Sequence, residues 1–120
     1  MSDGSVFLAV DLGAGSGRVI AGLMSGGRLS LEEVHRFENE PVEKREGLYW
    51  DFEGLWTGVV EGLRLSVERY GASNIRSIGV DTWGVDYGFI DKEGGFLGSL
   101  RHYRDPRTKG MYDDLATRVS

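Results

Sequence analysis

The chain has 120 residues, 14 of them Lys or Arg and 19 Asp or Glu, so its formal net charge is −5. This length suits one domain, and the acidic balance argues against a nucleic-acid-binding protein, because phosphate neutralisation needs clustered basic residues. The absence of cysteine excludes disulfides, a thiolate nucleophile and a thiolate zinc site. No apolar run approaches the ~20 residues of a membrane span or forms a signal peptide, and we expect a soluble cytoplasmic protein.

The first part of the chain predicts three antiparallel strands. A continuous apolar run over residues 6–10 predicts a buried strand, and residues 18–24 predict a second. The glycine-rich residues 25–27 predict a hairpin turn into a third strand over residues 28–32, whose pattern can extend towards Phe37.

A loop and a long helix are predicted next. Residues 38–48 are polar and contain Pro41 and Gly47, which is typical of a loop. One apolar stripe then recurs at three- and four-residue steps: Phe52, Leu55, Trp56, Val59, Val60, Leu63 and Val67. Asp51 is placed to cap this helix and Gly71 to end it. Three glycines form a second row, at positions 54, 58 and 62; each costs about 1 kcal/mol of helix propensity, so we expect this row to pack closely against another backbone.

The remaining elements are shorter. Residues 75–80 predict a strand, and two apolar runs, 87–90 and 96–100, flank a polar turn. Residues 111–119 have helical spacing without a cap at Ser120, so we expect the domain to continue beyond this chain.

A glycine-rich loop after the first strand is the first candidate site. Gly13, Gly15 and Gly17 leave backbone N–H groups free to bind phosphate oxygens. Ser16 adds a hydroxyl, and Arg18 adds a charged fork that matches phosphate geometry. The dinucleotide fingerprint fails, because its third glycine falls on Arg18, and no Gly-Lys-Ser/Thr follows for a P-loop. A phosphate-binding hairpin and an ordinary glycine-rich turn both remain open.

Two carboxylates form the second candidate site. Asp11 and Asp81 each end an apolar run. If the two strands are parallel neighbours, both carboxylates meet at the carboxyl edge of the sheet, where open α/β folds bind ligands. They could hold a hydrated Mg²⁺, which takes one or two carboxylates plus substrate phosphates. The alternative is a pair of aspartates that only form turns.

A sugar-binding surface is the third candidate. Trp83 offers an apolar platform for the C–H face of a sugar, and Gly84 permits close approach. Three further side chains could read hydroxyl groups: Asp86, Arg104 and Asp105. The alternative is that Trp83 belongs to the core and Asp105 begins a turn.

Three segments of the chain resemble the start of carbohydrate kinases of the FGGY family. They are residues 9–18 (AVDLGAGSGR), 77–87 (SIGVDTWGVDY) and 103–108 (YRDPRT). The middle block is the most specific, because xylulose and glycerol kinases of the same family look different there. One departure is Gly15, where the family more often has Ser; this removes a hydroxyl but keeps the loop.

The resemblance implies a fold and a reaction. The fold is α/β, an actin-like ATPase or ribonuclease H-like domain with a mixed sheet of order 3-2-1-4-5, which places Asp11 beside Asp81. Residues 1–120 would be the N-terminal part of the first of two domains. The implied reaction transfers the γ-phosphate of ATP, with Mg²⁺, to the 1-hydroxyl of L-rhamnulose in rhamnose degradation; L-fuculose is the alternative ketose.

The resemblance also assigns residues by position. The nucleotide phosphates would contact Gly13, Ala14, Gly15, Ser16, Gly17 and Arg18. Asp11 would lie near the metal and Gly84 would touch the sugar, with Trp83 and Asp105 as further candidates for the sugar pocket. The general base and the adenosine site would lie beyond residue 120, so we expect this chain alone to be catalytically silent. The alternative is a non-catalytic, actin-like module that binds a nucleotide or a sugar.

Overall fold

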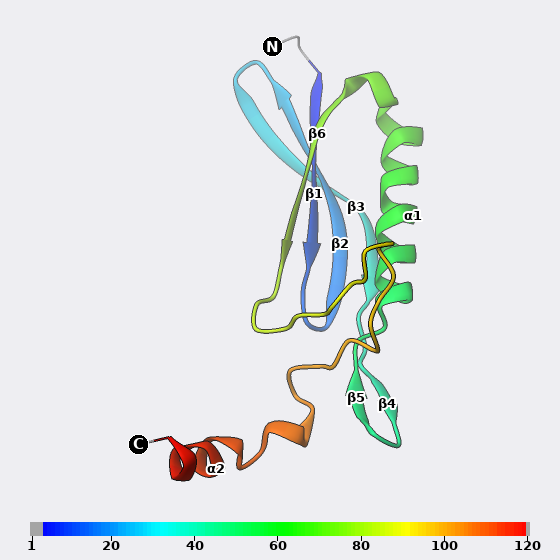
Figure 1. The fold of residues 1–120 in the computed structure, drawn as a ribbon. Helices are drawn as coiled ribbons and strands as arrows, with labels where there is room; N and C mark the ends of the chain where they lie inside the picture. Colours follow the sequence, from blue (N-terminus) through cyan, green and yellow to red (C-terminus); the bar gives the residue numbers. More distant parts are fainter. Residues whose placement is uncertain (1–3, 120) are drawn as a thin grey trace. The chain divides into compact units, whose positions relative to one another are not determined.

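The computed structural model describes residues 4–119, which form two compact units (Figure 1). Unit 1 contains residues 4–40 and 51–84, and unit 2 contains residues 41–50 and 85–119. The chain therefore passes from unit 1 into unit 2 at residue 41, returns to unit 1 at residue 51, and lies in unit 2 from residue 85 onward.

A four-stranded mixed sheet forms the body of unit 1 (Figure 1). Strand β2 (Ser16–Ser25) pairs antiparallel with both β1 (Ser5–Leu12) and β3 (Arg28–Glu38), and β6 (Ile75–Thr82) pairs parallel with β1. The resulting order is β3-β2-β1-β6. It confirms the first four places of the expected order; a fifth strand of this sheet is not among residues 4–119.

The long helix α1 (Phe52–Tyr70) packs against β2 and β3. The Asp51 carboxylate accepts a hydrogen bond from the Gly54 N–H at 3.0 Å, which caps the first turn as expected. Gly71, with φ of 79°, ends the helix. The core is a cluster of buried apolar side chains with partly buried neighbours: Val6, Leu8, Ala21, Leu63 and Tyr70. Each buried Val or Leu contributes roughly 1.5–3 kcal/mol, so the apolar face of α1 accounts for its position.

The glycine row of α1 packs closely, but against side chains rather than backbone. An added Cβ at Gly58 would collide with the ring of Phe37, and one at Gly62 would collide with Val19. Gly54 instead faces the capping carboxylate of Asp51. The expectation of backbone contact is therefore wrong, because β2 and β3 present large side chains to the space that the glycines leave.

Unit 2 contains a small hairpin where a loop was predicted. Strands β4 (Val42–Lys44) and β5 (Gly47–Tyr49) pair antiparallel across a turn in which Gly47 has φ of 140°. Strands of three residues are too short to show an alternating pattern, which is why residues 38–48 read as a loop.

Short elements complete the two units. The 3₁₀ turn η1 (Ala72–Asn74) joins α1 to β6, and η2 (Pro106–Thr108) precedes α2 (Met111–Arg118). Helix α2 confirms the helical spacing read at the end of the sequence. The expected polar turn over residues 91–95 is present, because the Asp91 N–H donates to the Gly95 carbonyl at 2.8 Å.

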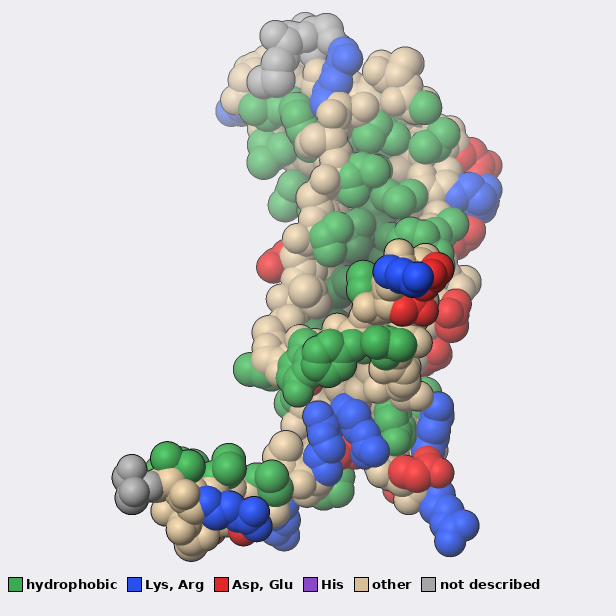
Figure 2. All heavy atoms as spheres, in the orientation of Figure 1, with side chains coloured by type: hydrophobic (Ala, Val, Ile, Leu, Met, Phe, Trp, Pro, Cys, Tyr) green, Lys and Arg blue, Asp and Glu red, His purple; other side chains and the backbone are tan. Residues whose placement is uncertain are grey.

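The surface of unit 1 is mixed in character. Figure 2 shows apolar side chains over the sheet and charged side chains along the outer side of α1. Ile78 and Val80 of β6 are 54% and 68% exposed. No helix within residues 4–119 is long and apolar enough to cross a membrane.

Candidate functional site

The glycine-rich loop joins β1 to β2 and is tight at its base. The ladder between the two strands continues to the pair Leu12 and Gly17. The Gly13 N–H then donates to the Ser16 carbonyl at 2.9 Å and closes the turn, so the expectation that this N–H is free for a phosphate oxygen is wrong. Gly17 is buried, and a side chain there would collide with the ring of Phe37. The base of the loop therefore tolerates only glycine at position 17.

The tip of the same loop is open. Ala14 and Gly15 are exposed, and no atom lies within 4 Å of the position that a Cβ at Gly15 would take. The loop thus combines a closely packed base with free space at its tip, where an anion could approach the backbone N–H groups.

Arg18 connects the loop to the first candidate carboxylate. Its Nη2 donates to the Ser16 carbonyl at 3.3 Å and to the Ser16 hydroxyl at 3.2 Å. Its Nε lies 3.5 Å from the Asp11 carboxylate. This Nε is buried and finds no hydrogen-bond acceptor among residues 4–119. A buried guanidinium N–H without an acceptor suits an anionic ligand that would supply one.

The end of β3 supplies two residues that sequence reasoning missed. Asn39 is 3% exposed; its Nδ2 donates to the Gly13 carbonyl at 2.8 Å, and its backbone N–H donates to the Gly15 carbonyl at 3.3 Å. Arg36 donates from Nη1 to the Ser16 hydroxyl at 3.2 Å. No signal for this pairing was present in the sequence, because an uninterrupted hairpin would place His35 opposite Arg18, and the register shift between Val19 and Ile20 places Arg36 there instead. Asn39 carried none, because it lies past the predicted strand.

The two candidate carboxylates meet as expected. Asp11 and Asp81 are direct partners in the parallel ladder between β1 and β6, so both lie on one face at one edge of the sheet. No group of three or more His, Cys, Asp or Glu residues that could hold a metal occurs in the described part of the chain. Two carboxylates beside a phosphate loop still fit Mg²⁺, which completes its octahedron with water and phosphate oxygens.

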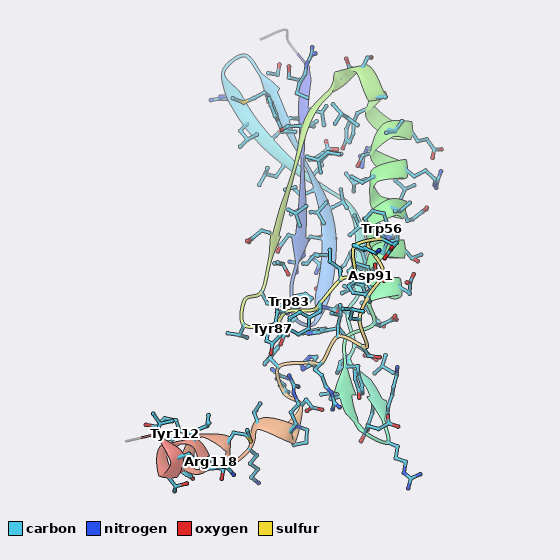
Figure 3. All side chains as sticks on the ribbon, viewed as in Figure 1. Trp56, Trp83, Tyr87, Asp91, Tyr112 and Arg118 are labelled. Atoms are coloured by element: carbon cyan, nitrogen blue, oxygen red, sulfur yellow. The ribbon has the colours of Figure 1, made fainter. Side chains whose placement is uncertain are left out.

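The end of β6 carries the candidate sugar residues of unit 1. Trp83 follows the strand directly and is half-buried (Figure 3), while Gly84 is exposed with open space where a Cβ would lie. Val85 then has φ of 68°, an unusual value for a β-branched residue. The backbone at Gly84 is therefore accessible, as close approach of a ligand requires.

Asp105 organises unit 2. Its side chain is 1% exposed, and its Oδ2 accepts from the Leu48 N–H at 2.7 Å. Oδ1 accepts from the Arg107 N–H at 3.1 Å, and Arg101 and Arg107 each form an ion pair at 3.2 Å. The Leu48 N–H, followed by the Arg107 and Arg101 donors, lowers the pKa of Asp105 to about 2. The carboxylate acts as an anchor for the chain here, and direct contact with a sugar hydroxyl stays a prediction.

Three aromatic rings of unit 2 lie against one another, two of them buried and that of Tyr103 exposed. The rings of Trp50 and His102 lie 3.9 Å apart between centroids, and Tyr103 stacks on His102 at 4.6 Å. Burial lowers the pKa of His102, whose Nδ1 accepts from the Arg104 N–H at 3.0 Å. The Trp50 indole N–H donates to the Asp86 carboxylate at 2.6 Å. Asp86, a candidate hydroxyl reader, is thus oriented by Trp50, which sequence reasoning did not place in a site.

The chain is similar in sequence to several curated rhamnulokinases. No model of a known protein family matches the chain. The rhamnulokinase of Bacteroides thetaiotaomicron is 44% identical over 114 residues, which are 95% of this chain and 23% of that protein. Those of Oceanobacillus iheyensis and Bacillus subtilis are 42% and 35% identical over 113 and 115 residues, covering 94% and 96% of this chain. The chain resembles the N-terminal part of rhamnulokinases. It spans about a quarter of the length of these curated relatives.

Solved structures show the same fold. A xylulose kinase from Lactobacillus acidophilus superposes with a TM-score of 0.77 at 13% identity, over 95% of this chain and 23% of that one. A gluconate kinase from the same organism gives 0.74 at 14% identity, with the same coverage. At such identities the likeness concerns the fold alone, and it confirms the expected fold class of sugar kinases.

Proposed function

We propose that this chain supplies the phosphate loop and part of the sugar site of an ATP-dependent kinase that phosphorylates L-rhamnulose on its 1-hydroxyl. The observation that carries the proposal is the pairing of Asp11 with Asp81 at the same sheet edge as the glycine-rich loop, beside which Arg18 lies. The name shared by the curated relatives supports rhamnulose as the sugar. The reaction would belong to rhamnose degradation in the cytoplasm.

The chain's own residues divide the work. The segment from Gly13 to Arg18 would bind the phosphates through the backbone N–H groups at its exposed tip, the Ser16 hydroxyl and the Arg18 guanidinium. Asp11, with Asp81 beside it, would hold Mg²⁺, which neutralises charge on the transferred phosphoryl group when bound. Arg18 lies between this carboxylate and the loop, so it would orient the phosphates relative to the metal.

The sugar would lie against the end of β6. Trp83 would present its ring to the apolar face of the sugar, and the bare backbone of Gly84 would permit close contact. Asp105 of unit 2 stays a candidate ligand of the sugar, as the resemblance implies. Phosphoryl transfer depends on a complete set of positioned groups, and we expect the general base outside these residues, so the 120-residue chain alone would not turn over.

The loop assignment is tested by Gly15→Asp, with Gly15→Asn as a control of the same size. Position 15 has room for either side chain, so the two variants differ in charge alone. A carboxylate a few ångströms from phosphate costs about 1–4 kcal/mol, and we expect ATP to bind to the Asp variant at least about fivefold more weakly than to the Asn variant. Equal affinities measured by calorimetry would contradict the loop assignment.

The substrate is tested by coupled ADP release from the full-length gene product, supplied with Mg-ATP and L-rhamnulose, L-fuculose or xylulose. A strong preference for L-rhamnulose is the expected result. Preference for another ketose would change the substrate and keep the phosphate loop. Binding of ATP without turnover on any sugar would contradict the kinase and favour a binding module.

A further inference from the structure

We infer that Arg36 of β3 is a second arginine at the phosphate loop. Arg36 would bind the nucleotide's terminal phosphates together with Arg18. The inference rests on the proposed function and assigns a new residue to the same site. Arg36 comes from a strand that the glycine-rich motif does not include.

The guanidinium groups of Arg18 and Arg36 converge on Ser16. Arg18 Nη2 and Arg36 Nη1 each lie 3.2 Å from the Ser16 hydroxyl oxygen. They are direct partners across the β2–β3 ladder, and partners in an antiparallel pair point to the same face of the sheet. Two positive groups therefore meet at one atom on the phosphate loop, an arrangement that a bound anion stabilises.

The Ser16 hydroxyl keeps its hydrogen available for a ligand. A serine oxygen accepts through two lone pairs and donates one hydrogen. The two arginines use both acceptor positions, which directs the hydroxyl hydrogen away from them. Ser16 can then donate to the same phosphate group that the arginines contact, so three donors serve one anion.

Glu33 orients the Arg36 side chain. Its Nε donates to Glu33 at 3.0 Å, and its Nη2 forms a second short hydrogen bond to the same carboxylate. The hydrogen bond between them lowers the pKa of Glu33 and raises that of Arg36. The Arg36 side chain is nevertheless 50% exposed, so its Nη1 edge is oriented by Glu33 and remains accessible to a ligand.

Arg18 and Asn39 lie beside Arg36 at the same loop and also suit an anionic ligand there. Arg18 Nε is buried without an acceptor among residues 4–119. Asn39, three residues after Arg36, holds the loop through the carbonyls of Gly13 and Gly15. The end of β3 thus fixes the shape of the loop with one residue and adds a positive charge to it with another.

The test is Arg36→Gln in the full-length gene product, with Arg64→Gln as the matched control. Arg64 is also bonded through two nitrogens to a glutamate three residues earlier, and its side chain is 58% exposed. We expect Arg36→Gln to weaken ATP binding by about tenfold or more, as for loss of a charge-assisted hydrogen bond. AMP, which lacks the terminal phosphates, should bind as before, and Arg36→Lys should recover part of the ATP affinity.

The outcomes separate the inference from the proposal beneath it. Unchanged ATP affinity in Arg36→Gln, or equal weakening of ATP and AMP, would overturn the inference. A lower unfolding midpoint than that of Arg64→Gln, with the ATP-to-AMP ratio unchanged, would assign Arg36 to the structure only. If Gly15→Asp weakens ATP binding and Arg36→Gln does not, the proposed loop stands and this inference fails; if neither variant matters, the proposed function fails.

Discussion

The two units of the chain are built by different kinds of contact. Unit 1 buries apolar side chains between a sheet and a helix: Val6, Leu8, Val10, Val19, Ala21 and Leu55. Unit 2 buries the aromatic residues Tyr49 and Trp50 together with the polar residues His102 and Asp105. Apolar burial is non-directional and follows a pattern along the chain, whereas a buried carboxylate needs specific donors. Unit 1 is therefore specified by periodicity and unit 2 by partners that are remote in sequence.

The same difference separates the candidate sites. The phosphate loop depends on glycines that fit around Phe37 and on hydrogen bonds from the adjacent strand. The segment around Asp105 depends on one carboxylate that reaches Leu48, 57 residues earlier. Substitutions should therefore act by volume in unit 1 and by lost hydrogen bonds in unit 2.

Gly62→Ala in unit 1 and Trp50→Phe in unit 2 are expected to have the two largest effects on stability. Alanine normally stabilises a helix by about 1 kcal/mol relative to glycine, but here its Cβ would collide with Val19. Overpacking of a core costs about 1–3 kcal/mol, so we expect a net loss of stability in chemical denaturation. Thr57→Ala, at an exposed position of α1, is the control. A gain in stability from Gly62→Ala would show that the glycine row is not a packing requirement.

Trp50→Phe in unit 2 is expected to lower the free energy of unfolding by a similar amount. Phenylalanine keeps the stack on His102 but loses the hydrogen bond to Asp86. Loss of a hydrogen bond to a charged group costs roughly 1–3 kcal/mol, which denaturation should detect. Trp56→Phe makes the same change on α1 (Trp56 is labelled in Figure 3), at a residue that is 57% exposed. Equal effects of the two substitutions would argue against a structural role for the indole N–H.

A pH-dependent effect is expected from Asp105. Its pKa of about 2 in the folded chain lies below the ordinary 3.8, so the unfolded chain binds the proton first as the pH falls. The stabilisation is complete above pH ~4 and is lost between about pH 4 and pH 2. The Leu48 amide resonance should shift over that range, and Asp105→Asn should abolish this dependence. An unchanged pH profile in the variant would assign the dependence to other carboxylates.

The smallest effect is expected from Arg64→Gln. Its ion pairs with Glu61 and Glu68 lie on the exposed side of α1, where solvent screening leaves little net stabilisation. Denaturation should show no change beyond experimental error. A clear loss of stability would mean that surface charges contribute to unit 1 as well as its apolar core.

Much of unit 1 was predictable from the sequence. The apolar run before Asp11 and the stripe through Leu55 and Leu63 predicted a strand and a helix that the structure contains. The resemblance predicted the neighbouring strands that bring Asp81 beside Asp11, and the ladder confirms them. These predictions succeeded because burial on one face imposes a period on the sequence.

The remaining features came from tertiary structure alone. Arg36 meets Arg18 only through the β2–β3 register, and Asn39 reaches the loop only because β3 ends beside it. Asp105 begins a turn, which was one of the two alternatives, because its carboxylate accepts from the Arg107 N–H, but its bond to the distant Leu48 N–H left no sign in the sequence. Local sequence determined which segments form strands and helices, since periodicity is a local property. The structure decided which polar groups meet, because hydrogen bonds between distant residues leave no periodic trace in the chain.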